Sequence, residues 1–165
     1  MKLTYFAYGS NMLTARLADR VPSTRPIDRA VLPAWELTFG KQGSDGSAKC
    51  TVVREEDSAV HGVLFHIDAS ERHLLDRAEG LGYGYEIEDF TVRLDGNPVD
   101  AFAYVATHDY IDTSLAPFHW YHALVLEGAR EHDLPEDYLE WLESIRRVSD
   151  PNPNRAEMNR RILLN

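Results

Sequence analysis

The chain has 165 residues, 44% hydrophobic and 27% charged, which is typical of a globular protein that folds as one domain. Its net charge of −10 argues against nucleic acid or an anionic membrane as a partner, because phosphate contacts require a basic face. The single cysteine, Cys50, excludes an internal disulfide and is interpreted as a buried strand residue. No apolar run is long enough for a signal sequence or a membrane span, so we expect a cytoplasmic protein.

The first part of the chain is expected to consist mainly of strands, because its apolar segments are rich in β-branched and aromatic residues. A helical pattern interrupts them at residues 11–19. The polar segment Lys41–Lys49 contains two glycines and is expected to be a mobile loop that borders the functional site. The expected strands cover residues 3–8, 30–40, 50–53 and 60–67.

The middle of the chain contains two local signals. Residues 68–80 predict a short helix in which Asp68 and Glu71 form a capping box and Gly80 ends the helix. Residues 85–94 and 99–107 read as strands, and the Asp-Gly dipeptide between them favours a hairpin.

The last part of the chain is expected to be helical. Two helical patterns cover residues 117–133 and 134–148, and a linker at 149–154 precedes a final helix that docks on the rest. We therefore expect one domain at residues 1–148, followed by a linker and C-terminal tail at 149–165. The order of elements predicts an α+β fold on a largely antiparallel sheet that curls towards a barrel.

The turn Tyr8-Gly9-Ser10-Asn11 lies between the first strand and the first helix. Gly9 permits unusual backbone angles and close approach of a ligand. Ser10 or Asn11 is suited to cap the helix, and the free amides of its first turn would form a pocket for a carboxylate or small phosphate. No nucleotide-binding P-loop motif is present. The alternative is an ordinary turn that only caps a helix.

Glu79 occupies the last turn of the predicted helix, directly before Gly80. The helix dipole favours cations at this end, so a carboxylate there is suited to accept a proton and return it, as a general acid/base must. The alternative is an exposed glutamate without a role.

Two other chemistries receive less support. His119 and His122 are three residues apart in a predicted helix, but no third ligand follows at a suitable spacing, so we predict no metal site. Ser10 is not part of a G-x-S-x-G motif, which disfavours a serine hydrolase.

Several segments together resemble the γ-glutamylcyclotransferase family, which belongs to the AIG2-like group. The resemblance covers residues 3 to about 145 in consistent order, in the segments YFAYGSNMLTARL, GVLF, LLDRAEGLGYGY, AFAYVA and GAREHDLPEDYLEWLESI. It implies a small mixed β-barrel flanked by helices. It also implies a cofactor-free reaction in which a γ-glutamyl amide closes on itself, giving 5-oxoproline and a free amine or amino acid.

The resemblance also assigns roles to residues of this sequence. Glu79 matches the catalytic glutamate, Tyr121 matches a tyrosine at the substrate pocket, and Tyr104 matches one on the core strand and is expected to bind substrate as well. Either Tyr83 or Tyr85 would line the pocket, and Tyr85 is our choice. The loop would hold either the glutamyl carboxylate or the developing oxyanion. Its residues are Tyr8, Gly9, Ser10, Asn11 and Met12.

The Tyr-Gly-Ser-Asn loop favours a branch acting on γ-glutamyl amino acids or amines over the glutathione-specific branch, whose loop usually reads Tyr-Gly-Ser-Leu. Two alternatives stay open. One is removal of a γ-glutamyl group from a specific amine or biosynthetic intermediate, and the other is a non-catalytic module that binds small carboxylates. We expect a monomer or homodimer that binds a small γ-glutamyl substrate and needs no metal or cofactor.

Overall fold

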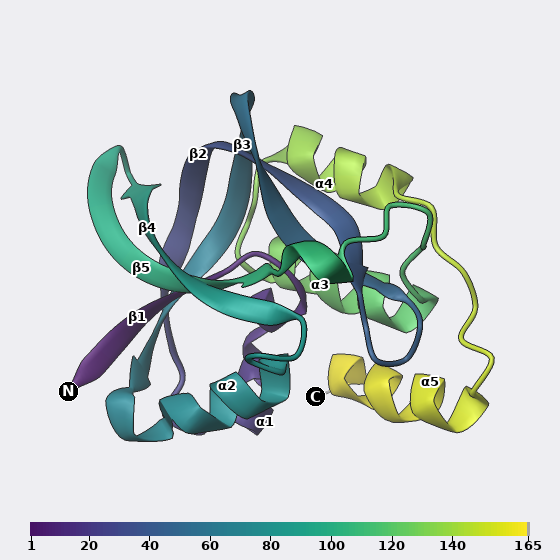
Figure 1. Ribbon diagram of the computed structural model, residues 1–165. Coiled ribbons are helices and arrows are strands. Elements are labelled where there is room, and N and C mark those ends of the chain that lie inside the picture. Colours follow the sequence, from purple (N-terminus) through teal and green to yellow (C-terminus); the bar gives the residue numbers. More distant parts are fainter. Residues whose placement is uncertain (165) are drawn as a thin grey trace.

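The computed structural model describes residues 1–164, in which five strands close into a barrel flanked by helices (Figure 1). Asn165, the last residue of the predicted tail, lies outside the described residues. The strand order is β1-β3-β2-β4-β5, and a parallel pairing of β1 with β5, at Tyr5 and Phe102, closes the barrel. The other pairings are antiparallel, which confirms the predicted small, mixed, largely antiparallel barrel. The strands are β1 (Lys2–Ala7), β2 (Arg25–Gln42), β3 (Ala48–Asp68), β4 (Tyr85–Leu94) and β5 (Asn97–Ala106).

The third strand is longer than predicted. The sequence suggested separate strands at 50–53 and 60–67, whereas β3 runs without interruption through both. Trp35 pairs with Arg54 and Pro33 with Ala59, so Ala34 alone faces the four residues 55–58. These extra residues form an irregular, largely exposed projection, visible beside the label β3 in Figure 1, and their polar sequence looked like a break between two strands.

The predicted loop at Lys41–Lys49 is present but shorter than expected, because the strands extend into both of its ends. β2 continues to Gln42 and β3 begins at Ala48, so the connection is the short segment Gly43–Ser47. Asp45 holds this segment, because its carboxylate accepts hydrogen bonds from the Ser47 amide at 2.9 Å and from Lys49 Nζ at 2.8 Å.

The predicted hairpin is confirmed. β4 and β5 pair in register from Tyr85–Ala106 to Leu94–Asn97. The turn residues Asp95 and Gly96 have φ angles of 49° and 79°, as expected for two-residue hairpin loops that follow the twist of the strands.

The helices around the barrel include α1 (Thr14–Arg20), α2 (Arg72–Glu79), α3 (His119–Glu131), α4 (Glu136–Ser144) and α5 (Pro153–Arg160). Short 3₁₀ turns cover Ser10–Met12, Ala69–Glu71, His108–Tyr110 and Arg161–Leu164. Gly80 ends α2 with a φ of 74°, as predicted. The predicted capping box is wrong, because Glu71 accepts a hydrogen bond from the amide of Ser23 and Asp68 caps no helix with its side chain.

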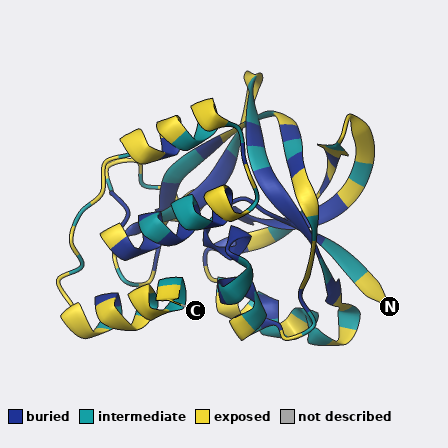
Figure 2. Cartoon of the chain, turned by 180° about the vertical axis from the view of Figure 1, so that it is seen from behind, coloured by how far each residue is buried: buried dark blue, intermediate teal, exposed yellow. Residues whose placement is uncertain are grey.

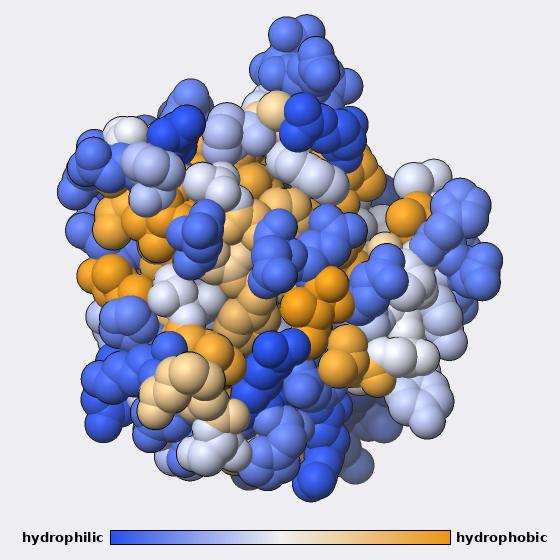
Figure 3. All heavy atoms as spheres, turned by 60° about the vertical axis from the view of Figure 1, so that its left-hand side comes forward, coloured by the Kyte–Doolittle hydropathy of each residue, from blue (hydrophilic) through white to orange (hydrophobic). Residues whose placement is uncertain are grey.

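The helices bury one side against the barrel and expose the other (Figure 2). Gly128 of α3 lies against the 3₁₀ turn after β1, where an added Cβ would come within 2.5 Å of the Leu13 amide nitrogen. This close approach fixes α3 against the segment that carries the predicted site. The face in Figure 3 is mostly hydrophilic, with scattered hydrophobic groups. Among residues 1–164, no helix is both long and apolar enough to cross a membrane.

Candidate active site

A small pocket lies where the loop after β1 meets the end of α2 and the barrel interior. Its volume is about 30 Å³, which gives room for a group the size of a carboxylate. Eight of the nine residues predicted for the site line it, and Tyr5 and Cys50 complete the wall. The lining residues are Tyr5, Tyr8, Gly9, Ser10, Asn11, Cys50, Glu79, Tyr85, Tyr104 and Tyr121.

Met12 is the ninth predicted residue, and the structure places it in the core instead. It is fully buried and packs beside Gly128, where an added Cβ would lie 2.8 Å from Met12 Cβ. Its neighbour Asn11 points into the pocket because the 3₁₀ turn sends successive side chains in different directions. Met12 therefore supports the loop from behind.

Glu79 is held in place by two donors. Its Oε1 accepts a hydrogen bond from Asn11 Nδ2 at 2.7 Å and lies 3.0 Å from Arg20 Nη1. Both contacts hold the carboxylate at the end of α2, facing the loop. Glu79 Oε2 makes no hydrogen bond within residues 1–164, so this oxygen is available to a bound molecule.

Asn11 connects three groups of the site. Besides donating to Glu79, its amide nitrogen donates to the Tyr5 hydroxyl at 3.1 Å, and its Oδ1 accepts from Arg20 at 2.9 Å. The prediction that Ser10 or Asn11 caps the first helix is wrong, because no side chain caps α1 and its N-cap residue is Leu13. The polar side chains of the loop instead make hydrogen bonds to other residues of the site.

The backbone of the loop retains free donors. The amides of Met12 and Leu13 bond to the carbonyls of Gly9 and Ser10, at 3.1 and 3.3 Å. The amides of Ser10 and Asn11 make no hydrogen bond in the part of the chain that the structure describes. Two adjacent buried N–H groups without a partner are suited to bind an anion at the pocket.

Gly9 is required for close packing rather than for its backbone angles, since its φ is −114°. A Cβ at this position would lie 3.1 Å from Cys50 Cβ and 3.3 Å from the Tyr121 hydroxyl. Cys50 is buried, as predicted, and burial raises the pKa of its thiol to about 12. The thiol is therefore neutral at physiological pH and forms part of the wall.

Four tyrosines form the rest of the wall, and the hydroxyls of three of them make hydrogen bonds to backbone groups. The Tyr8 hydroxyl donates to the carbonyl of Tyr104, and the Tyr85 hydroxyl donates to the carbonyl of Cys50 at 2.6 Å. The Tyr121 hydroxyl accepts from the Cys50 amide at 2.9 Å. Burial raises the pKa of all four phenols, so they are neutral hydrogen-bonding groups.

The structure also distinguishes Tyr83 from Tyr85. Tyr83 is 80% exposed, whereas Tyr85 is buried and lines the pocket. Gly82 and Gly84, on either side of Tyr83, both have positive φ angles and turn it outwards. Tyr104 also contacts α2, because its hydroxyl donates to Asp76 Oδ1 at 2.5 Å.

A wider cleft continues outwards from the pocket and has a volume of about 660 Å³. Ser10, Glu79, Tyr85 and Tyr121 line both spaces, so they mark the boundary. Five cationic side chains line the cleft, and Glu79 is the one acidic residue among its lining residues. Sequence reasoning missed these cations, which are Arg16, Arg20, Lys41, Lys49 and Arg77.

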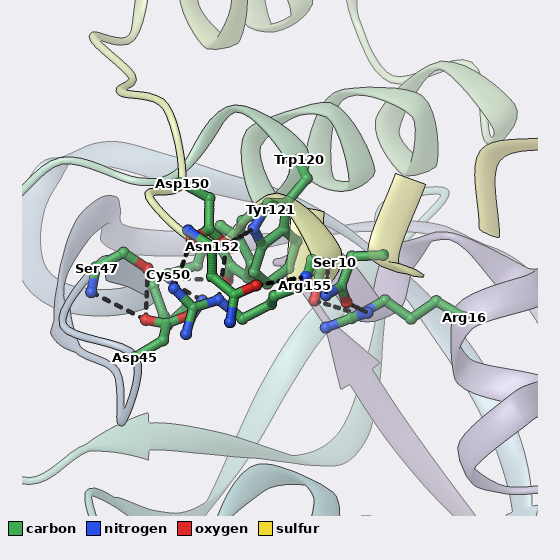
Figure 4. A network of polar contacts seen from close by, with 12 residues as sticks. Ser10, Arg16, Asp45, Ser47, Cys50, Trp120, Tyr121, Asp150, Asn152 and Arg155 are labelled. Carbon is green, nitrogen blue, oxygen red and sulfur yellow. Dashed lines mark hydrogen bonds and ion pairs between the residues drawn. The ribbon is translucent and has the colours of Figure 1, made fainter. Parts of the chain in front are cut away.

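Arg16 ties the loop to the C-terminal helix. Its Nε donates to Ser10 Oγ at 3.0 Å, and its Nη1 lies 3.4 Å from Asn159 Oδ1 in α5. Figure 4 shows Arg16 and Ser10 at one end of a row of polar contacts that continues through Arg155 to Asp150. Burial and the nearby Arg20 lower the pKa of Arg16 to about 10, so it stays cationic at neutral pH.

The two histidines considered as metal ligands lie away from the pocket. His122 is buried, and its Nε2 lies 2.7 Å from the carbonyl of Leu142, while His119 is exposed at the start of α3. Within residues 1–164, no three His, Cys, Asp or Glu side chains are grouped to hold a metal ion.

The chain is similar to proteins named gamma-glutamylcyclotransferase. A family model described as the AIG2-like family matches residues 59–142, which include Glu79. The gamma-glutamylcyclotransferase of Homo sapiens is 30% identical over 165 residues, covering 96% of this chain and 84% of that protein. The protein of the same name from Mus musculus is 30% identical, covering 94% and 82%. A solved structure described as a gamma-glutamyl cyclotransferase has 27% identity and a TM-score of 0.83, covering 96% of this chain and 99% of that one.

Proposed function

Because the chain belongs to the γ-glutamylcyclotransferase (AIG2-like) family, we propose that it cyclises γ-glutamyl amides, releasing 5-oxoproline and a free amine or amino acid. The observation that carries the proposal is the position of Glu79. It is a single carboxylate, held by Asn11 and Arg20, at the boundary between a pocket for a small anionic group and an open cleft.

Glu79 is the group that moves protons in this reaction. The substrate's α-nitrogen attacks its own γ-carbonyl carbon, a new C–N bond closes the five-membered ring, and the original γ-amide C–N bond breaks. The α-ammonium loses two protons in becoming the lactam N–H, and the leaving nitrogen gains two in becoming an ammonium. Glu79 starts as the carboxylate and carries the two protons one after the other, each time taking a proton from the α-nitrogen and giving it to the leaving nitrogen, so it ends as the carboxylate and the protons balance without another reagent.

The free amides of Ser10 and Asn11 bind negative charge on the substrate. They hold either its α-carboxylate or the oxyanion that develops when the γ-carbonyl is attacked. The neutral tyrosine wall excludes water and bends the substrate, so that its amine and carbonyl meet. This arrangement supplies the entropic part of the rate enhancement.

A non-catalytic carboxylate-binding module is the weaker reading of the same pocket. An anion binder gains nothing from a carboxylate of its own at the pocket wall, because like charges repel. The size and openness of the cleft favour a substrate whose leaving group extends away from the glutamyl end. Removal of a γ-glutamyl group from one specific amine would use the same chemistry.

The test is release of 5-oxoproline from a panel of γ-glutamyl dipeptides, γ-glutamyl amines and glutathione. We expect release by the wild type, and a loss of more than about 100-fold in kcat for Glu79→Gln, because a general acid/base contributes roughly 10²–10⁴-fold. Glu140→Gln, an exposed change on α4, is the matched control and should leave the rate unchanged. Equal activity in wild type and Glu79→Gln would remove Glu79 from this role, and binding of 5-oxoproline without any turnover would favour the binding module.

A further inference from the structure

The cleft outside Glu79 has a charge opposite to that of the whole protein. The chain carries a net charge of −10, yet five cations and one carboxylate line the cleft. Most of these cations are already engaged. Arg20 pairs with Glu79, Lys49 pairs with Asp45, and Arg16 bonds to Ser10 and Asn159.

Two of the cations have no such partner within residues 1–164, and of these Arg77 is exposed, whereas Lys41 is buried. It is only 7% exposed, near the end of β2, and its ammonium makes no hydrogen bond or ion pair within residues 1–164. Lys41 Nζ lies 4.5 Å from the centre of the Tyr85 ring and 5.7 Å from that of Tyr110. The side chain is buried but lines the cleft, so its ammonium is within reach of a bound molecule, and the two aromatic faces supply only part of the stabilisation that an anionic partner would give.

The backbone next to Lys41 makes room for it. Gly84 has a φ of 126°, and an added Cβ there would lie 2.8 Å from Lys41 Cε and 2.9 Å from Nζ. The same turn carries Tyr83 outwards and places Tyr85 under the ammonium. The neighbouring backbone and rings therefore fix the position of Lys41, although its ammonium has no hydrogen-bond acceptor within residues 1–164.

We propose that Lys41 determines substrate specificity by binding an anionic group on the leaving amine, so that anionic leaving groups are preferred over neutral or cationic ones. The proposal rests on the proposed function, because the cleft is the leaving-group side only if cyclisation occurs at Glu79. Glu79 and Tyr85 line both spaces, so a glutamyl group in the pocket directs its amide substituent past Glu79 towards Lys41. Burial lowers the pKa of Lys41, and an anion at this position would stabilise its charged form.

The experiment uses γ-glutamyl substrates that differ at the end of the leaving group. γ-Glutamyl-ethylamide is neutral, γ-glutamyl-β-alanine and γ-glutamyl-alanine are anionic, and the mono-amide of ethylenediamine is cationic. We expect kcat/KM of the wild type to be about 10- to 100-fold higher for the better anionic substrate than for the ethylamide, the range for a hydrogen bond between charged groups. The cationic substrate should be the poorest, and added salt should reduce the preference.

The variant Lys41→Met keeps the side-chain length and removes the charge. It should lose the preference for anionic substrates, so that the ratio of kcat/KM between the better anionic substrate and the ethylamide falls to about one, whatever the absolute rate of the variant. Lys2→Met, an exposed change at the start of β1, is the matched control. A preference that survives in Lys41→Met, or a wild type that uses the ethylamide equally well, would overturn the inference and leave the proposed function intact.

Failure of the proposed function gives a different result. If the wild type releases no 5-oxoproline from any substrate, cyclisation is refuted, and calorimetric binding decides about Lys41. Tighter binding of γ-glutamyl-β-alanine than of the ethylamide, lost in Lys41→Met, supports anion recognition. Equal binding of the two, or binding of neither, overturns it. The salt dependence of the wild type gives an independent measurement if Lys41→Met proves unstable.

Discussion

The substitution Asn11→Ala tests whether the loop positions Glu79. Asn11 is 4% exposed, and its side chain makes three hydrogen bonds, to Tyr5, Glu79 and Arg20. Alanine removes all three and leaves Glu79 Oε1 with Arg20 as its one remaining partner among the described residues. The carboxylate is then free to swing towards Arg20 and away from the pocket.

The size of the effect follows from these contacts. A neutral hydrogen bond contributes about 1 kcal/mol to stability, and one to a charged group contributes about 1.5–3 kcal/mol when fully buried. The side chains of Arg20 and Glu79 are 24% and 15% exposed, so we take about 1 kcal/mol for each of their bonds. The free energy of unfolding is therefore expected to fall by about 3 kcal/mol. A shift of the carboxylate by about 1 Å would lower kcat roughly 100-fold.

Urea denaturation measures the first quantity, and 5-oxoproline release under saturating substrate measures the second. The matched control is Asn154→Ala in α5, an exposed position where the change should stay within about 0.5 kcal/mol. A double-mutant cycle with Glu79→Gln isolates the pair, with an expected coupling of about 1 kcal/mol in the free energy of unfolding. A coupling near zero together with unchanged kcat would refute the idea that Asn11 positions Glu79.

Two further predictions concern the wall and the C-terminal segment. Tyr121→Phe leaves the buried Cys50 amide without its acceptor, so the free energy of unfolding should fall by about 1–3 kcal/mol in urea denaturation, and an unchanged value would mean that another group accepts this hydrogen bond. The Arg155 guanidinium holds the pKa of Asp150 well below its ordinary value, so this pair stabilises the fold above about pH 4 and loses its effect as the pH falls further. Asp150→Asn should therefore flatten the loss of stability as the pH falls below about 4, and an equally steep loss in the variant would contradict the assignment.

Local signals predicted the local structure well. The Asp95-Gly96 hairpin and the end of α2 at Gly80 depend on residues that tolerate positive φ, and such positions are readable from the sequence. The predictions about side-chain capping failed for the opposite reason. Ser10, Asn11 and Glu71 had suitable residue types for capping, but Ser10 bonds to Arg16 instead, and the partners of Asn11 and Glu71 lie far along the chain. Long-range contacts of this kind leave no local trace.

Only part of the site was predicted, for the same reason. Glu79 and the loop stood out through their places at a helix end and at a strand–turn–helix junction, and the resemblance joined them. Lys41 lay in a segment whose composition predicted a polar loop, and no pattern around Arg20 marked it as a site residue. Both enter the site only because β2 is part of the closed barrel and α1 packs beside the end of α2. Nothing in the spacing of the sequence indicates that closure.

The net charge illustrates the same separation between composition and site. A value of −10 argues against a broad basic face for phosphate, and it would equally suggest a poor binder of small anions. The cleft has the opposite sign, because cations from β2, β3, α1 and α2 converge on it and Glu79 is the one acidic residue in its lining. An anionic γ-glutamyl substrate is repelled by the surface as a whole and attracted within the cleft over a distance of about 10 Å. The few charges that the fold brings together therefore determine which ligand binds. Lys41 is buried and lacks an ion-pair or hydrogen-bond partner within residues 1–164, so it gains the most from an anionic ligand.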